Sequence, residues 1–167
     1  MADPPAAGPA GPPQPGQPQA DLHWLREAIE LSRRCPPSES AFSVGAVLVG
    51  GAGEVIATGY SRERDPKDHA EEVALARAAG DPRLAGATLY SSLEPCLARA
   101  SRPRSCAELI LEAGIPRVVL AWLEPPLFTG GGGAAALRRG GVTVVEIPWL
   151  AGLARSVNAH LAGLESD

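Results

Sequence analysis

The chain has 167 residues, a net charge of −4 and a pI of about 5.4. That length suits one domain with its own core. No block of five like charges occurs, so no nucleic-acid or anionic-membrane partner is expected. No apolar run approaches the roughly 20 residues that span a bilayer, and the N-terminus lacks the pattern of a signal peptide. Three cysteines cannot pair completely, which favours reduced thiols and a cytoplasmic protein over a disulfide-stabilised one.

The first 20 residues contain seven prolines and no aromatic or β-branched residue. Such a segment buries too little apolar area to offset its ordering entropy, so residues 1–20 are predicted to be a disordered tail. The folded domain is predicted over 21–167. It begins with Asp21 as the N-cap of a helix whose apolar residues share one face, and Pro36–Pro37 ends that helix.

Strands and helices alternate along the rest of the chain. An apolar strand at 44–49 and a second at 54–60 form a hairpin, and Asp68 caps a helix that starts at His69 and runs to residue 78. Further strands are predicted at 87–91, 117–121 and 142–147, and further helices at 106–113, 134–139 and 149–164. This order predicts an α/β fold, a three-layer α/β/α sandwich with a five-stranded mixed sheet.

Two short stretches carry the residues with catalytic potential. The first is His69-Ala70-Glu71, and the second contains Pro95-Cys96 and is followed by Cys106. One imidazole and two thiolates can hold Zn²⁺ and leave its fourth tetrahedral position to water. Glu71 is then free to move protons, as the hydrolytic removal of an exocyclic amine from a nucleobase requires. The pattern predicts a zinc-dependent aminohydrolase with His69, Cys96 and Cys106 as metal ligands and Glu71 as the catalytic acid–base.

The predicted helix gives this site its geometry. Residues two apart diverge by about 200° around a helix, but at a helix N-terminus both can reach a group at the helix end. A structural zinc site is the main alternative. It usually closes with four protein ligands, and the third cysteine, Cys35, is distant in the sequence.

These motifs resemble the cytidine deaminase-like superfamily. Residues 87–96 resemble the strand and turn that carry its first cysteine, and nine residues separate Cys96 from Cys106. A long inter-cysteine loop is typical of the pyrimidine deaminases of riboflavin biosynthesis, and the resemblance to their stand-alone form covers roughly residues 41–147. It implies hydrolysis of the 2-amino group of a diaminopyrimidinone ribosylamine 5′-phosphate. It also implies a homodimer or homotetramer, with the Ala70 or Glu71 N–H and the Glu94 C=O orienting the base.

Two sets of side chains have open roles. Arg99, Arg102 and Arg104 in the inter-cysteine loop form either a solvated basic loop or a clamp for a substrate phosphate. Arg62 and Arg64 are rival candidates for the clamp. Trp122, Phe128 and Trp149 are expected in the core rather than stacked on a base.

Other functions remain open. Ala41-Phe42 departs from the Asn-Pro pair usual in the fused riboflavin enzymes. A CMP- or dCMP-type deaminase, or a pyrimidine deaminase of a specialised metabolite, therefore stays possible. Editing of RNA or DNA bases is disfavoured by the acidic pI and the low aromatic content of 4%. A catalytically silent zinc-binding regulatory subunit is the alternative from another class, and it would have no reason to keep Glu71.

Overall fold

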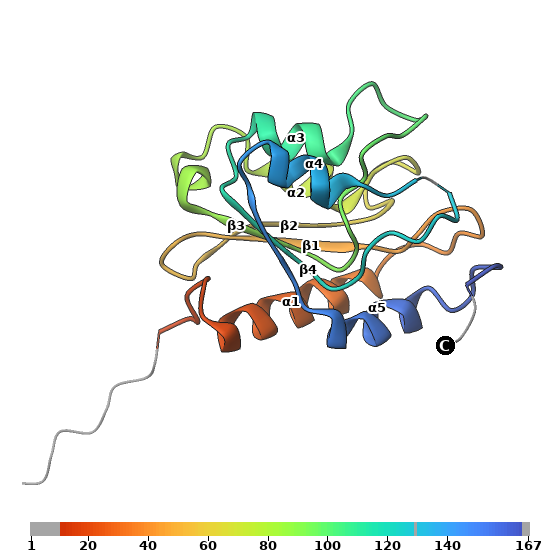
Figure 1. Ribbon diagram of the computed structural model, residues 1–167, viewed down its shortest axis with the longest axis horizontal. Helices are drawn as coiled ribbons and strands as arrows, with labels where there is room; N and C mark the ends of the chain where they lie inside the picture. The colour runs from red at the N-terminus through yellow and green to blue at the C-terminus, as the bar shows by residue number, and fades with distance from the viewer. Residues whose placement is uncertain (1–10, 129, 165–167) are drawn as a thin grey trace, which may run out of the picture.

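A computed structural model describes residues 11–128 and 130–164. Five strands form one sheet in the order β2-β1-β3-β4-β5. Helices α1 and α5 cover one face of this sheet, and α2, α3 and α4 cover the other (Figure 1). The strands are β1 Gly45–Val49, β2 Val55–Tyr60, β3 Thr88–Ser91, β4 Arg117–Leu120 and β5 Thr143–Glu146. The helices are α1 Pro18–Ser32, α2 Ala70–Arg77, α3 Cys106–Glu112, α4 Gly133–Arg139 and α5 Ala151–Val157, with 3₁₀ turns η1 Pro82–Gly86 and η2 Pro148–Leu150. The predicted three-layer α/β sandwich is confirmed.

The sheet is mixed, as predicted. β1 runs antiparallel to β2 and β3, whereas β3, β4 and β5 run parallel to one another. Every residue of β1 and of β3 is buried. Helices on both faces explain why β1 is continuously apolar rather than alternating. Because β3 and β4 are parallel, their C-terminal ends lie at the same end of the sheet. The N-termini of α2 and α3 lie close to the segment that follows β3.

The start of the first helix differs from the prediction. Helix α1 begins at Pro18, so Asp21 lies in its first turn and is not its N-cap. A proline fits the first turn of a helix because the N–H that it lacks would have no partner there. Trp24 Nε1 donates to the Pro13 carbonyl at 2.8 Å, so part of the predicted tail contacts the domain. The remainder of that tail, residues 1–10, lies outside the described residues.

The last helix is shorter than predicted. Helix α5 ends at Val157, and residues 158–164 form turns. Asn158 is the C-cap residue of α5, and its side chain accepts from Ser43 N at 2.7 Å and donates to Ser43 O at 3.1 Å. Trp149 is 71% exposed, so the prediction that it lies in the core is wrong, whereas Trp122 is buried. No helix in the described part of the chain is long and apolar enough to cross a membrane.

Candidate metal centre and pocket

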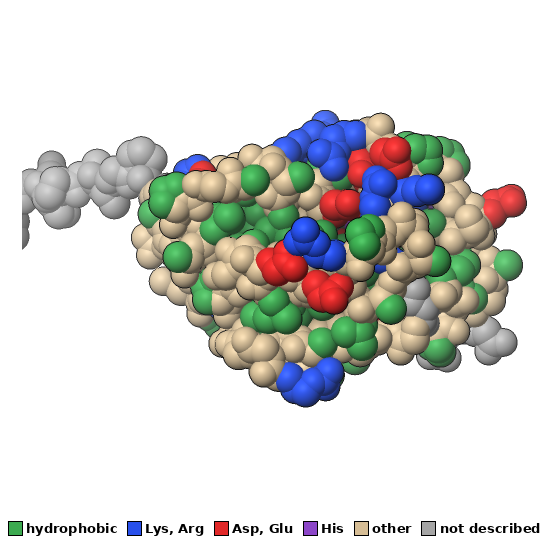
Figure 2. All heavy atoms as spheres, turned by 90° about the horizontal axis from the view of Figure 1, so that it is seen from above, with side chains coloured by type: hydrophobic (Ala, Val, Ile, Leu, Met, Phe, Trp, Pro, Cys, Tyr) green, Lys and Arg blue, Asp and Glu red, His purple; other side chains and the backbone are tan. Residues whose placement is uncertain are grey.

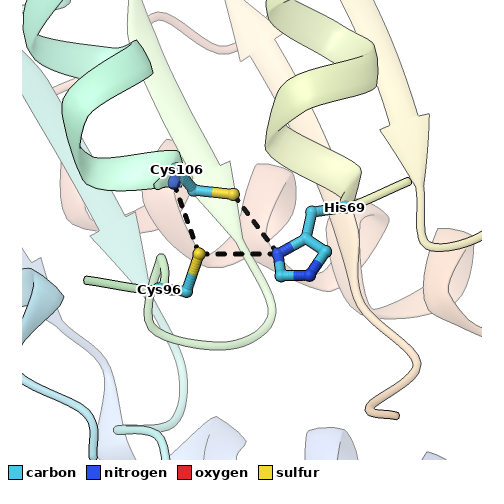
Figure 3. A group of neighbouring side chains, drawn as sticks. All are labelled: His69, Cys96 and Cys106. Carbon is cyan, nitrogen blue, oxygen red and sulfur yellow. Dashed lines mark hydrogen bonds between the residues drawn. The ribbon is translucent and has the colours of Figure 1, made fainter. Parts of the chain in front are cut away.

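Three side chains from separate segments meet beside the end of β3. His69 precedes α2, Cys96 follows β3, and Cys106 is the first residue of α3. His69 Nδ1 lies 3.5 Å from Cys96 Sγ and 3.4 Å from Cys106 Sγ (Figure 3). The ligand atoms of all three residues lie within 4.8 Å of one another. The structure therefore brings together the three predicted metal ligands.

The spacing of these atoms fits zinc. Zn–N bonds of about 2.0 Å and Zn–S bonds of about 2.3 Å at a tetrahedral angle put nitrogen and sulfur about 3.5 Å apart. Both nitrogen–sulfur distances agree with that value. One imidazole and two thiolates also match the softness of Zn²⁺. A set of three protein ligands, rather than four, is the pattern of catalytic sites.

Helix α2 starts one residue later than predicted. His69 is its N-cap, with φ −96° and ψ 152°, and Glu72 accepts from the His69 N–H at 3.3 Å. The extended backbone of His69 takes its side chain off the helical path, so the divergence of about 200° does not apply. Asp68 is therefore not the cap. Its carboxylate instead accepts from the N–H groups of Arg64 and Asp65 and holds the preceding loop.

The two cysteines are joined through the backbone. Cys106 N–H donates to Cys96 Sγ at 3.3 Å, and Ala107 N–H donates to Cys96 O at 3.1 Å. The Cys106 thiol, together with the His69 imidazole, lowers the pKa of the Cys96 thiol to about 4 despite its burial. The hydrogen bond between its thiol and that of Cys96, together with burial, raises the pKa of Cys106. Metal binding is therefore coupled to release of the remaining thiol proton.

Glu71 lies beside the metal ligands. It is 3% exposed, and its Oε1 lies 3.0 Å from the Ser91 hydroxyl on β3. Burial raises the pKa of the Glu71 carboxyl. A carboxyl whose pKa moves toward neutrality can accept and return a proton at working pH. The sequence analysis missed this contact of Ser91 with Glu71. A usable signal was that Ser91 and Leu89, two residues apart on one strand, share a face of the sheet.

The turn that carries Cys96 is clamped from the other side. Glu94 accepts from Glu124 N–H and from Ala134 N–H, both at 2.9 Å. A Cβ at Gly133 would lie 1.7 Å from the Pro95 carbonyl, so the N-terminus of α4 fits against the turn only with glycine. The side chain of Glu94 thus braces the turn, which the sequence analysis did not foresee. Ala70 is the first residue of α2, so its N–H has no carbonyl partner within the helix.

A pocket of about 350 Å³ opens over this centre, within the range of small-molecule sites. Apolar side chains form much of its wall, and Phe42 and Phe128 meet edge to face with centroids 5.1 Å apart. Phe128 is 42% exposed and lines the pocket, so its prediction as a core residue is wrong. The lining includes the predicted ligands His69 and Cys96 together with Glu71, Leu93 and Glu94.

The arginines of the inter-cysteine loop are held by carboxylates. The Arg99 side chain is 2% exposed and pairs with Glu72 at 3.1 Å. Arg102 pairs with Asp65 at 3.3 Å, and Arg104 with Glu112. Neither Arg102 nor Arg104 lines the pocket, and Figure 2 shows acidic and basic side chains interleaved on the face that α2, α3 and α4 cover. This placement favours a loop braced by ion pairs over a phosphate clamp.

Arg62, a rival candidate for the clamp, has a different task. It has φ +61°, and its guanidinium donates to Pro36 O, Phe42 O and the Ser43 hydroxyl. Arg64 pairs with Asp68. Arg62 thus ties the segment before β1 to the loop before α2, and the remaining pocket cation is Lys67, which the sequence analysis overlooked.

The family is identified by comparison with known proteins. The model of the cytidine and deoxycytidylate deaminase zinc-binding region matches residues 18–122, more than half of the chain. The chain belongs to this family. His69, Glu71, Cys96 and Cys106 all lie within the matched region.

Two relatives narrow the resemblance. A Schizosaccharomyces pombe protein named diaminohydroxyphosphoribosylamino-pyrimidine deaminase is 40% identical over 126 residues, or 74% of this chain and 31% of that protein. The riboflavin biosynthesis protein RibD of Aquifex aeolicus is 38% identical over 128 residues, or 75% and 34%. The chain thus spans about a third of the length of these relatives.

Solved structures share the fold. RibD of Acinetobacter baumannii aligns with a TM-score of 0.71 and 33% identity, covering 83% of this chain and 38% of that chain. The Rib2 deaminase of Aspergillus oryzae aligns with a TM-score of 0.73 and 23% identity, covering 85% and 92%. The cytidine deaminase-like fold is therefore confirmed.

Proposed function

We propose that this protein is a zinc-dependent hydrolytic deaminase of a pyrimidine nucleotide. The observation that carries the proposal is a buried carboxyl, Glu71, which lines the same pocket as His69 and Cys96, two of the three residues spaced to hold zinc. A structural zinc site needs no such carboxyl beside it. The most favoured substrate is the diaminopyrimidinone ribosylamine 5′-phosphate of riboflavin biosynthesis, which would lose its 2-amino group. The 40% identity to the fission yeast deaminase and the nine-residue inter-cysteine loop support that choice.

Each residue of the pocket then has a task. His69, Cys96 and Cys106 would hold the zinc ion, whose Lewis acidity makes a water molecule acidic near neutral pH. Glu71 takes a proton from the attacking water, delivers it to a ring nitrogen, and later helps to protonate the departing amine, which leaves as ammonia. The Ala70 N–H is proposed to bind a ring carbonyl and the Glu94 C=O to accept from the amine. Phe42, Leu93 and Phe128 would shield the ring from bulk water.

The runner-up is a CMP- or dCMP-type deaminase. The family description includes deoxycytidylate deaminases, and a cyanophage dCMP deaminase shares the fold at 22% identity and a TM-score of 0.60. A pyrimidine deaminase of a specialised metabolite would use the same residues. All of these activities share the roles of Glu71 and the zinc ligands, so they differ only in how the pocket selects its substrate.

An ammonia-release assay tests the proposal. The zinc-loaded protein would be given the diaminopyrimidinone ribosylamine phosphate, CMP, dCMP and cytidine in parallel, with Glu71→Gln as the matched inactive variant. We expect turnover of the first substrate alone. Turnover of a cytosine nucleotide instead would replace the substrate assignment and keep the chemistry. Failure to release ammonia from any of the four, with one zinc bound per chain, would contradict the proposal and favour a regulatory subunit.

We also propose a cytoplasmic homodimer or homotetramer. The described cysteines are free thiols, and two of them serve as metal ligands only while reduced. Trp149 is 71% exposed and Leu123 47% exposed, which suits burial in a contact between copies of the chain. Light scattering on the purified protein should give a mass of two or four chains, and a monomer at micromolar concentration would contradict this part of the proposal.

A further inference from the structure

Lys67 is the only lysine among the 15 basic residues of the chain, and it lines the catalytic pocket. It is exposed and lies two residues before the metal ligand His69. In the described part of the molecule, no carboxylate lies within ion-pair distance of its ammonium group. Lys67 is thus a positive charge at the pocket that the folded chain does not neutralise.

The other two pocket-lining cations are already occupied. Arg99 is almost fully buried, and its guanidinium donates to the Glu72 carboxylate and the Ser101 hydroxyl as well as to a backbone carbonyl. Arg62 donates to two carbonyls and the Ser43 hydroxyl. Freeing either guanidinium for a ligand would break several hydrogen bonds that hold the loops around the pocket. Lys67 can bind an anion without that loss.

The backbone of Lys67 is held at both of its polar groups. Its N–H donates to Asp65 Oδ1 at 2.8 Å, and its carbonyl accepts from Arg99 Nη2 at 2.5 Å. The two neighbouring carboxylates are themselves neutralised, Asp65 by Arg102 and Asp68 by Arg64. The backbone of Lys67 is therefore already ordered, so binding of an anion by its ammonium group needs to order only the side chain.

We propose that Lys67 binds the phosphate group of the nucleotide substrate, and that Arg99 is a positioning residue that holds the Lys67 backbone at the pocket. The identity of the base rests on the function proposed above, but the phosphate site does not depend on it. Lys67 lines a cavity of about 350 Å³, and its ammonium group is the kind of point charge that binds phosphate. The arginine-rich loop would then contribute to phosphate binding by holding Lys67 through Arg99, without touching the phosphate itself.

A single lysine allows a direct binding test. Reductive methylation with ¹³C-formaldehyde labels only Lys67 and the α-amino group, and Lys67→Gln identifies the Lys67 signal. The zinc-loaded protein would be titrated with ribose 5-phosphate and, separately, with ribose. We expect ribose 5-phosphate to shift the Lys67 signal to saturation and ribose to leave it in place, with the α-amino signal as an internal reference. Equal shifts with the two sugars, or no shift of Lys67 with either, would overturn the proposal.

Steady-state kinetics give a second, independent readout. Lys67→Gln should raise KM for the phosphorylated substrate about 10- to 100-fold, as expected for one charge-assisted hydrogen bond, and change kcat little. The matched control is Arg26→Gln, which removes one positive charge from the exposed surface of α1 on the other side of the sheet. An unchanged KM in Lys67→Gln would refute the phosphate role. If the wild type turns over no phosphorylated pyrimidine but ribose 5-phosphate still shifts Lys67, the function proposal fails and the anion site stands.

Discussion

Two buried carboxyls on opposite faces of the sheet have opposite electrostatic environments. Asp21 on α1 is 4% exposed, and Glu71 on α2 is 3% exposed. Although burial opposes it, the Arg117 guanidinium and the Tyr90 hydroxyl lower the pKa of Asp21. Burial raises the pKa of Glu71, and its carboxylate accepts a hydrogen bond from the Ser91 hydroxyl. Both side chains have low solvent exposure, but the guanidinium of Arg117 favours the charged form of Asp21, whereas deep burial favours the protonated form of Glu71.

Neighbouring residues of β3 supply these two environments. Tyr90 donates to Asp21 Oδ1 at 2.7 Å on the α1 side, and Ser91 contacts Glu71 on the α2 side. Successive side chains of a strand point to opposite faces, so one strand serves both carboxyls. Arg117 on β4 completes the Asp21 cluster with bonds of 2.8 and 2.7 Å. The Asp21 cluster links helix α1 to strands β3 and β4, whereas Glu71 on the other face lies in the proposed active site.

The largest expected effect is on turnover. Glu71→Gln keeps the size of the side chain and removes its ability to carry a proton, so we expect ammonia release to fall about 1,000-fold. Zinc stoichiometry should stay at one per chain. The melting temperature should not fall, because the substitution removes a carboxyl whose charge is disfavoured by burial. An active Glu71→Gln variant, or one that no longer binds zinc, would contradict the proposal that Glu71 transfers protons without being a metal ligand.

Asp21→Asn is the matching change on the other face. It leaves the Arg117 guanidinium, 20% exposed, without its anion, so we expect a loss of about 3 kcal/mol in the free energy of unfolding. Urea unfolding measures this loss directly. The activity of the protein that remains folded should equal that of the wild type. A stable but inactive Asp21→Asn protein would mean that the cluster under the sheet takes part in catalysis.

The adjacent pair on β3 sharpens the comparison. Tyr90→Phe should cost about 1 kcal/mol of stability and leave kcat unchanged, because one hydrogen bond to Asp21 is lost. Ser91→Ala should lower kcat about 10-fold, because Glu71 loses the hydroxyl that orients it, while the unfolding free energy changes by less than in Tyr90→Phe. Steady-state kinetics and urea unfolding on both variants would show whether stability is lost in Tyr90→Phe and activity in Ser91→Ala. Equal losses of activity in the two variants would contradict the assignment of Tyr90 and Ser91 to separate roles on opposite faces of the sheet.

The smallest effect concerns pH. Since the pKa of Asp21 is lowered from its usual 3.8, the stability that it contributes is complete above pH 4 to 5 and is lost as pH falls through the lower folded-state pKa. The difference in unfolding free energy between wild type and Asp21→Asn should therefore be constant from about pH 5 to 7 and shrink below about pH 4. Protonation of the metal ligands affects both proteins and cancels in the difference. A difference that grows on acidification would have the wrong sign.

The sequence predicted the metal centre better than its surroundings. His69, Cys96 and Cys106 follow from residue type and spacing, because few patterns other than zinc binding bring such residues to strand and helix ends. The roles of Arg99 and Lys67 did not follow, because both are basic residues near the site. Only the three-dimensional placement shows that Arg99 pairs with Glu72, while none of the carboxylates in residues 11–128 and 130–164 pairs with Lys67. Pairing across separate loops leaves no local signal in the sequence.

The predicted boundaries of α1 and α5 were wrong where a side chain at the helix end binds a residue far away in the sequence. Asp21 has the residue type of an N-cap, yet Arg117, 96 residues away, recruits its carboxylate. Asp68 is a different case, because its carboxylate accepts from the N–H groups of Arg64 and Asp65, four and three residues earlier, and holds the loop before α2. Asn158, the residue after α5, binds Ser43, 115 residues away. Local propensity cannot anticipate such long-range hydrogen bonds, whereas the continuous apolar run at 44–49 was enough to predict the buried strand β1.

The most direct test of the central claim is a zinc titration of the metal-free protein with ammonia release as the readout. The account predicts that activity of the wild type on its pyrimidine substrate rises linearly with added Zn²⁺ and stops at one equivalent per chain. Glu71→Gln should bind the same single equivalent and stay inactive. Activity in the absence of zinc, or restored activity in Glu71→Gln on zinc addition, would contradict the assignment of His69, Cys96, Cys106 and Glu71 to one hydrolytic centre.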